Sequence, residues 1–349
     1  MKDQRKNFYD HDLEEIEQLL GSWGEPRYRA VQVWEAVYQQ LKPGPESISN
    51  IPKSLRARLA DHFSWANLQP DISLTSTDGE TTKTLFRLED DNAIETVLMQ
   101  YEKRRTLCIS SQAGCALGCV FCATGQMGLR RNLSSGEIVE QVLHFERLLR
   151  EQDQGLTNVV VMGMGEPLHN YAQVMAAIDR LNHVQGLNFG ARRFTISTVG
   201  LIPQMMRFAR EKRQINLAVS LHAAEDVLRS SILPVNKKYP LVELIDACRE
   251  YVSLTRRRIT FEWALISGVN DSIQQATQLA DLINGILCHV NIIPLNPTAG
   301  YVGSATSALQ VRQFKEQLEN RGIPVTIRVR RGIDIHAGCG QLAVHKSST

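Results

Sequence analysis

The chain has 349 residues, of which 43% are hydrophobic and 22% are charged, and its formal net charge is +2. These values are ordinary for a soluble globular protein with one large core or two domains. No run approaches the roughly 18 apolar residues of a membrane span, and the first residues contain no apolar signal region, so we expect a cytoplasmic protein without membrane contact.

The first part of the chain predicts a small helical domain over residues 1–70. A helix with one apolar face begins near Leu13 and ends at Gly21. Further helices are predicted over residues 28–41 and 51–63. By itself such a domain names no function.

The next stretch, residues 71–105, changes to a period of two. The runs 83–88 and 93–99 predict two strands of a hairpin that turns at residues 90–92. Glu95 lies in the second strand. From the residues alone, the simplest expectation for a strand glutamate is a solvent-facing side chain.

Strands and helices alternate over residues 106–343. Strands are predicted at 106–110, 158–162, 193–197, 215–221, 259–265 and 289–293, with a last extended segment at 325–329. Helices are predicted at 134–149, 171–182, 203–210, 240–252, 272–285 and 307–321. Six parallel strands with crossover helices imply one α/β sheet, either doubly wound or curled into a barrel. Residues 344–349 form a short tail.

Four of the seven cysteines fall between Cys108 and Cys122. The last three are Cys115, Cys119 and Cys122, spaced C-x3-C-x2-C, and intervening glycines let one loop turn three thiolates toward one point. Three thiolates suit a [4Fe–4S] cluster that keeps one iron for another ligand. Zinc is the main alternative, but its structural sites usually need a second cysteine pair or histidines. The odd, clustered cysteines fit a reducing compartment better than a disulfide framework.

Several small or polar residues follow the ends of the predicted strands, where barrels place their reactive groups. They are Gly165, Glu166, Ser197, Ser220, His222 and Asn296. Taken singly, each has an ordinary explanation, such as a tight turn at Gly165. Together, the polar groups can converge on one small polar ligand. Cys339 stands alone between glycines, whereas Cys248 and Cys288 are expected to pack in the core.

The cysteine spacing, with Phe121 before the third cysteine, resembles the signature of the radical SAM superfamily. Four motifs together resemble the RlmN/Cfr family of RNA adenine methyltransferases, over about residues 20–343. They are Cys108-Ile-Ser-Ser-Gln112, Gly163-Met-Gly-Glu-Pro167, Ser220-Leu-His222 and Asp334-Ile-His-Ala-Gly-Cys-Gly-Gln-Leu342. The resemblance implies a partial (β/α)6 TIM-type barrel over 106–343, an RNA-contacting domain over 1–70 and a β-hairpin linker over 71–105.

The resemblance also implies the roles of site residues. Cys115, Cys119 and Cys122 would hold the [4Fe–4S] cluster. The strand-end residues Gly165, Glu166, Ser197, Ser220, Leu221, His222 and Asn296 would bind S-adenosylmethionine, two molecules of which are used per turnover. Cys339 would carry the methyl group, and Cys108 would resolve the RNA adduct and form a Cys108–Cys339 disulfide. Glu95 would be a proton acceptor.

The function implied is methylation of adenine C2 in 23S rRNA, with tRNA as a second candidate substrate. A monomer with a reductant such as flavodoxin or ferredoxin is expected. A Cfr-type adenine-C8 methyltransferase is the nearest alternative, and a radical SAM activase acting on protein or small molecules is a more distant one. Lys237-Lys-Tyr-Pro240 and Asn296-Pro-Thr298 favour RlmN, whereas Arg331-Gly-Ile-Asp-Ile335 lies between the two patterns.

Basic residues bunch at several places along the chain. They occur at 103–105, 130–131, 192–193, 237–238, 256–258 and 328–331. If several clusters share one face, they would form a phosphate-binding footprint for RNA. The alternative is scattered solvated charge.

Overall fold

One sheet of ten strands organises the computed structural model, which describes residues 5–343; the predicted tail at 344–349 lies outside the described residues. Its strands, from one edge to the other, are β14 (Val325–Ile327), β13 (Cys288–Pro294), β12 (Ile259–Leu265), β11 (Asn216–Ser220), β10 (Phe194–Thr198), β9 (Asn158–Val161), β6 (Arg105–Cys108), β5 (Ala93–Gln100), β4 (Thr81–Arg87) and β3 (Gln69–Thr75). In this sheet each neighbouring pair from β6–β9 to β13–β14 is parallel, whereas the pairs β3–β4, β4–β5 and β5–β6 are antiparallel.

The order of the parallel strands distinguishes a partial barrel from a doubly wound sheet. Each of them lies beside the next one along the chain, with only the small β7–β8 ribbon inserted after β6. A doubly wound sheet reverses its strand order at a switch point, and the described strands show no such reversal. The two edges, β14 and β3, do not pair with each other. The predicted partial barrel is therefore confirmed, and β14 adds a seventh parallel strand within the described chain.

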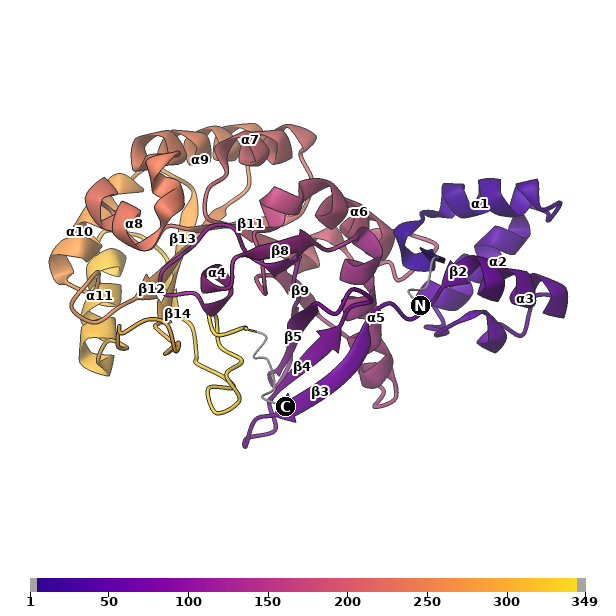
Figure 1. The fold of residues 1–349 in the computed structure, drawn as a ribbon. Helices are drawn as coiled ribbons and strands as arrows, with labels where there is room; N and C mark the ends of the chain where they lie inside the picture. Colours follow the sequence, from indigo (N-terminus) through magenta and orange to yellow (C-terminus); the bar gives the residue numbers. More distant parts are fainter. Residues whose placement is uncertain (1–4, 344–349) are drawn as a thin grey trace.

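Helices cover the outer face of the barrel sheet (Figure 1). They are α5 (Ser135–Arg150), α6 (Tyr171–Asn182), α7 (Ile202–Glu211), α8 (Asp226–Ile232), α9 (Leu241–Thr255), α10 (Ile273–Leu282) and α11 (Ala308–Asn320). The predicted capping box is present at α5, where the Ser134 hydroxyl accepts from the Glu137 amide and the Glu137 carboxylate accepts from the Ser134 amide. The short helix α8 was not predicted. No described helix is both long and apolar enough to cross a membrane.

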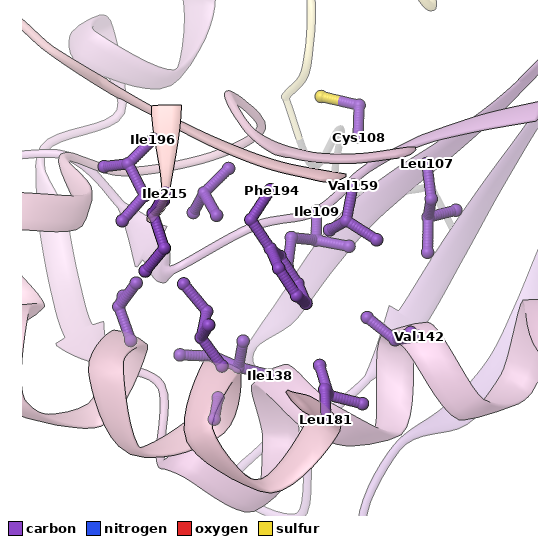
Figure 2. Packing of buried hydrophobic residues seen from close by; sticks show 14 of the residues in the cluster. Leu107, Cys108, Ile109, Ile138, Val142, Val159, Leu181, Phe194, Ile196 and Ile215 are labelled. Atoms are coloured by element: carbon purple, nitrogen blue, oxygen red, sulfur yellow. The ribbon is translucent and has the colours of Figure 1, made fainter. Parts of the chain in front are cut away.

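The packing between helices and sheet decides which way each strand residue faces. Ile138 and Val142 of α5 contribute to the buried cluster beneath the sheet, together with Leu107 and Phe194 (Figure 2). The Cys108 side chain points away from this helix layer (Figure 2). Because successive strand residues alternate between faces, Cys108 faces the interior of the barrel.

The N-terminal domain lies to one side of the barrel, next to α5 and α6 (Figure 1). Its helices are α1 (Leu13–Ser22), α2 (Tyr28–Tyr38) and α3 (Lys53–His62), and a short parallel pair joins β1 (Lys6–Asn7) to β2 (Phe63–Ser64). Asp10 accepts hydrogen bonds from the Gly136 amide (2.6 Å) and the Ser135 hydroxyl (3.0 Å). A carboxylate at the N-terminus of α5 is favoured by the helix dipole, so this contact docks the domain onto the barrel.

A buried carboxyl, Glu140 on α5, lies in the same interface. It accepts hydrogen bonds from the Asn67 amide (3.0 Å) and the Asn7 side chain (3.2 Å), and burial raises its pKa to about 8. Between its ordinary value of 4.5 and about 8 the folded protein therefore binds more protons than the unfolded chain, so stability falls as pH rises through this window.

Replacing Glu140 with glutamine is expected to remove this loss of stability. The variant should exceed the wild type by about 1–3 kcal/mol at pH 8.5 and match it near pH 5, because one pKa unit corresponds to about 1.4 kcal/mol. Urea unfolding at both pH values measures the difference. The exposed helix residue Glu250 gives a matched Glu250→Gln control. If the free energy of unfolding of Glu140→Gln exceeded that of the wild type by the same amount at both pH values, the prediction would be contradicted.

The predicted hairpin exists, but it is part of the barrel sheet. Strands β4 and β5 are antiparallel, with the Leu88 amide donating to the Asn92 carbonyl (2.9 Å) across the predicted turn, and β5 continues onto β6. The third strand, β3, was missed because all its residues are exposed, so it shows no buried alternate face.

The irregular segment of residues 328–343, here called the strap, crosses the open side of the barrel. It follows β14 directly, and its first residue is joined to β13 by a hydrogen bond from the Arg328 amide to the Ile292 carbonyl (2.8 Å). It reaches the hairpin strands through Asp334, which accepts from the Thr77 amide (2.8 Å), and through the Arg331–Glu80 ion pair. Figure 1 shows this yellow segment between β14 and the purple hairpin. The strap thus fills the gap that the sheet leaves open.

Candidate active site

The three clustered cysteines lie on the loop that follows β6. This loop includes β7 (Gln112–Gly114), α4 (Ala123–Gln126) and β8 (Leu129–Asn132). The Cys115 amide donates to the Gly128 carbonyl and the Cys122 amide to the Cys119 carbonyl, each at 3.1 Å. A side chain at Gly125 would come within 3.1 Å of the Cys119 backbone, so this glycine permits the tight packing of the loop.

The thiols of Cys115, Cys119 and Cys122 line one cavity at the carboxyl ends of the strands. Burial raises the pKa of Cys115 to about 12 and raises the pKa values of the other two, and positively charged iron would offset that cost. Among residues 5–343, no three His, Cys, Asp or Glu side chains converge closely enough to hold one metal ion. The thiols of a [4Fe–4S] cluster bind different irons. Three thiols on three irons leave the fourth iron for another ligand, so the donor set fits such a cluster.

The strand ends bring the predicted cofactor residues to the same cavity. Its lining includes Gly165, Glu166, Ser197, Ser220, His222 and Asn296. Leu221 does not line the cavity, because its side chain is buried in the main hydrophobic core. The cavity thus combines thiols, one carboxyl, hydroxyls, an imidazole and an amide.

Glu166 is held in place by backbone groups around it. Its carboxyl accepts from the Val199 amide (3.0 Å) and the Leu168 amide (3.1 Å), and burial raises its pKa to about 7. Its own amide donates to the Gln112 side chain (2.8 Å). Gly165 has φ +100, and a Cβ there would lie 2.6 Å from Gln112. Only glycine suits this backbone, which turns Glu166 toward the cavity.

His222 offers a neutral ring to the cavity. Its Nδ1 accepts from the Ala264 amide (2.9 Å), so the ring proton lies on Nε2. Burial lowers its pKa to about 3, and its ring packs edge-on against Phe121 at 5.1 Å. Its φ of +60 is uncommon for a residue other than glycine, and the Asn270 side chain holds its carbonyl (2.7 Å).

Asn296 has an unused acceptor in the cavity wall. Its amide nitrogen donates to the Cys339 carbonyl (3.1 Å), whereas its buried Oδ1 has no hydrogen-bond partner among the described residues. A buried polar atom without a partner costs free energy. A hydroxyl or ammonium of a bound cofactor would satisfy it, so the cavity fits S-adenosylmethionine at this point.

Cys108 and Cys339 line a second cavity that adjoins the first. Both cavities share Cys122, Asn296 and Arg328 in their walls, and Cys339 also lines the first. Burial raises the pKa of Cys108 to about 12. The charge of the nearby Cys339 raises the pKa of Arg328 above its usual range. This guanidinium places a positive charge in the walls of both cavities.

Sequence reasoning missed two charged residues of this site, Glu262 and Arg328. Glu262 is a buried carboxyl in the apolar strand β12 that lines the cofactor cavity. It accepts from the Asn291 side chain (2.7 Å), and burial raises its pKa while Arg328 opposes this. A carboxylate within an apolar strand was the available signal for Glu262. Arg328 was seen only as one of a run of basic residues.

The expectation that Glu95 faces solvent is wrong. Its side chain is 5% exposed and pairs with Lys83 Nζ at 2.9 Å. It shares one face of β5 with Val97 and Met99, which line the second cavity. Glu95 is therefore placed beside the cavity of the two lone cysteines.

The basic clusters do not form one surface. Arg131 is engaged by Asp90 and Glu137. Arg192 and Arg257 both donate to Gln214 at the starts of the parallel strands, which is the end opposite to the cysteine cavities. The 328–331 cluster instead lines the second cavity. The RNA footprint expected from these clusters is thus divided between two ends of the barrel.

Two known protein families match this chain, one in the N-terminal domain and one in the barrel. Residues 6–64 match the ribosomal RNA large subunit methyltransferase N-terminal domain, and residues 109–280 match the radical SAM superfamily. The second match contains the three cavity cysteines and ends within α10.

Similar proteins match over nearly the whole chain. A dual-specificity RNA methyltransferase RlmN 1 from Myxococcus xanthus is 48% identical, covering 97% of this chain and 95% of the relative. A probable dual-specificity RNA methyltransferase RlmN from Chloroflexus aurantiacus is 45% identical, covering 97% and 93%. The crystal structure of a radical SAM methyltransferase from Sphaerobacter thermophilus superposes with a TM-score of 0.95 at 52% identity, covering 97% and 99%.

Proposed function

The chain belongs to the RlmN family of radical SAM RNA methyltransferases, and on that premise we propose that it methylates carbon C2 of an adenine in 23S rRNA, with tRNA as a second substrate. The observation that carries the proposal is the adjacency of two cavities, one lined by three thiols and the other by Cys108 and Cys339. Adenine C2 is electron-poor and has no lone pair, so direct displacement on a sulfonium methyl has no nucleophile there. A cysteine carrier beside a radical site meets this need.

The chain's own residues would hold the cofactors as follows. Cys115, Cys119 and Cys122 bind the [4Fe–4S] cluster, which together with S-adenosylmethionine supplies the methyl group and one-electron chemistry. Glu166 accepts from the methionyl ammonium, and Asn296 Oδ1 accepts from the same ligand. Ser197, Ser220 and the Nε2 proton of His222 serve its carboxylate or ribose, while Leu221 fixes the strand end from the core. We propose two molecules of S-adenosylmethionine per turnover.

The second cavity would perform the transfer. Cys339 would accept the methyl group, and once the one-electron chemistry of the cofactors has removed one hydrogen atom from it, the methyl carbon would form the bond to adenine C2 and the adduct would return one electron to that chemistry. Glu95 accepts the proton that C2 loses. Cys108 attacks the Cys339 sulfur and breaks its bond to the carbon, which keeps the electron pair and takes up a proton, so the methylated base leaves and a Cys108–Cys339 disulfide forms. A reductant such as flavodoxin or ferredoxin would supply the electron for the cluster, and thiol–disulfide exchange with a separate dithiol would return the disulfide to two thiols.

The RNA must present the adenine outside its stack to bring C2 to Cys339, because Cys339 lies in a cavity lined by residues of β5 and of the strap. Such a base is reached most cheaply in a loop or single strand. Both cavities are built from one chain, so we propose that a monomer is active.

RNA from a strain that lacks the gene tests the assignment. Mass spectrometry of digested ribosomal RNA should show loss of 2-methyladenosine, restored by the wild-type gene but not by Cys339→Ala. Loss of 8-methyladenosine instead would assign the protein to the C8 reaction. Loss of neither base would overturn the proposal.

A further inference from the structure

A buried ion pair on the hairpin lies directly against the strap. Lys83 on β4 and Glu95 on β5 are 9% and 5% exposed, and their charged groups are 2.9 Å apart. In the strand register Lys83 is opposite Val97, and Glu95 is opposite Leu85. The ion pair is therefore a diagonal contact across one face of the hairpin.

Both partners also hold backbone groups of the strap. Lys83 Nζ donates to the His336 carbonyl (3.3 Å), and Glu95 Oε2 accepts from the Ala343 amide (3.0 Å). His336 and Ala343 lie on either side of Cys339 in the sequence. The ion pair thus forms hydrogen bonds with the strap on both sides of Cys339 in the sequence.

The opposite side of the strap is tied to the cysteine loop and to β13. The Ala123 amide donates to the Gly340 carbonyl (2.8 Å), and the Thr124 hydroxyl donates to the Leu342 carbonyl (2.6 Å). Asn296 holds the Cys339 carbonyl. The strap between these anchors is neither helix nor strand, so its position depends on contacts with its two neighbours.

A buried ion pair is weak evidence for added stability, because desolvation offsets much of the attraction between the charges. What this pair supplies is geometry, since each charged group makes a further charge-assisted hydrogen bond to the strap. We propose that the Lys83–Glu95 pair is a clamp that fixes the strap, and that Lys83 is a positioning residue for Cys339. The role of Cys339 rests on the proposed function, whereas the clamp itself is a property of the fold.

The clamp matters because Cys339 serves more than one partner. Its sulfur must meet the methyl donor in the first cavity, the adenine, and Cys108 in the second. Displacements of about 1 Å in such arrangements cost rate on the order of a hundredfold. A loosened strap should therefore slow methyl transfer, while the three clustered cysteines and the strand ends that line the rest of the cofactor cavity stay in place.

The test replaces Lys83 with methionine, which keeps the aliphatic stem and removes the ammonium, in the reconstituted holoenzyme. Hydrogen exchange should accelerate about tenfold or more within residues 336–343, because exchange reports local opening, with no change in α6 or α9. The kcat for RNA methylation should fall at least tenfold, with KM for RNA and S-adenosylmethionine affinity unchanged. Lys83→Arg should restore part of the loss.

Arg87 provides the matched control on the same strand. It pairs with Asp71 at 2.8 Å and is largely exposed, so Arg87→Met should leave exchange and kcat unchanged. Unchanged exchange in the strap of Lys83→Met would overturn the clamp. If that variant does not fold, the double variant Lys83→Met/Glu95→Leu leaves no unpaired buried charge and should show the same accelerated exchange.

The two proposals fail separately. If the wild-type protein methylates no adenine, the proposed function is wrong, and the exchange experiment still decides whether the clamp exists. If wild-type methylation is present and the strap of Lys83→Met exchanges as in the wild type, only the clamp is wrong.

Discussion

Replacing Cys108 with alanine is expected to leave the protein covalently joined to its RNA. The variant keeps Cys339, which can take the methyl group and form the carbon–carbon bond. It lacks the thiol that breaks the bond between the Cys339 sulfur and that carbon. Both cysteines line one cavity, and the third cysteine in its described lining is Cys122, which is assigned to the cluster. We therefore expect no other thiol to take over the role of Cys108. The measurement is a gel shift of the protein that disappears on RNase treatment.

Cys339→Ala should behave differently from Cys108→Ala. It should carry no methyl group by intact mass and give neither product nor crosslink. The buried Cys248 and Cys288 lie outside both cavities, so their alanine variants serve as controls and should lose only packing stability, on the order of 1 kcal/mol. Normal turnover by Cys108→Ala, or methylated RNA from Cys339→Ala, would show that the carrier mechanism is wrong for this protein.

Replacing Cys115, Cys119 and Cys122 together with alanine should abolish cluster binding. Anaerobically reconstituted wild-type protein is expected to contain about four irons per chain. The triple variant should lose the iron, the brown absorbance and the cleavage of S-adenosylmethionine together, because the three thiols line the cofactor cavity. Iron analysis and the absorbance spectrum measure the loss.

Cys288→Ala is the control for the triple variant, since it removes a buried thiol at the start of β13, outside the cofactor cavity. It should keep its iron and its cleavage activity. Iron retained by the triple variant would contradict the cluster assignment. So would zinc in wild-type protein purified without oxygen.

The parallel part of the fold was predictable because its elements are buried. The run 259–265 is a strand of β-branched and apolar residues, and helix 171–182 has one apolar face; both bounds agree with the structure. The exposed strand β3 has no such pattern, and the short helix α8 buries few residues. The signals used in prediction come from burial, so elements with little burial were missed.

The cysteine loop was visible in the sequence because its ligands are close together along the chain. The contacts between the strap and the Lys83–Glu95 pair were not visible, because their residues are far apart in the sequence. The Ala343–Glu95 contact spans 248 residues, and the His336–Lys83 contact spans 253. For the same reason the solvent-facing expectation for Glu95 was wrong. Its burial follows from the strap packing onto the hairpin, which no local pattern encodes.

The position of the strap after all the strands of the sheet in the sequence also orders the assembly of the protein. A chain emerging from the ribosome folds from its N-terminus, so the hairpin, the cysteine loop and the strands that line the first cavity are synthesised before Cys339. Contacts that span about 250 residues form late, because closing such a large loop costs chain entropy. The cysteine loop can therefore take shape before Cys339 is synthesised, and Cys339 enters the cavities only after all the strands of the barrel sheet have been made.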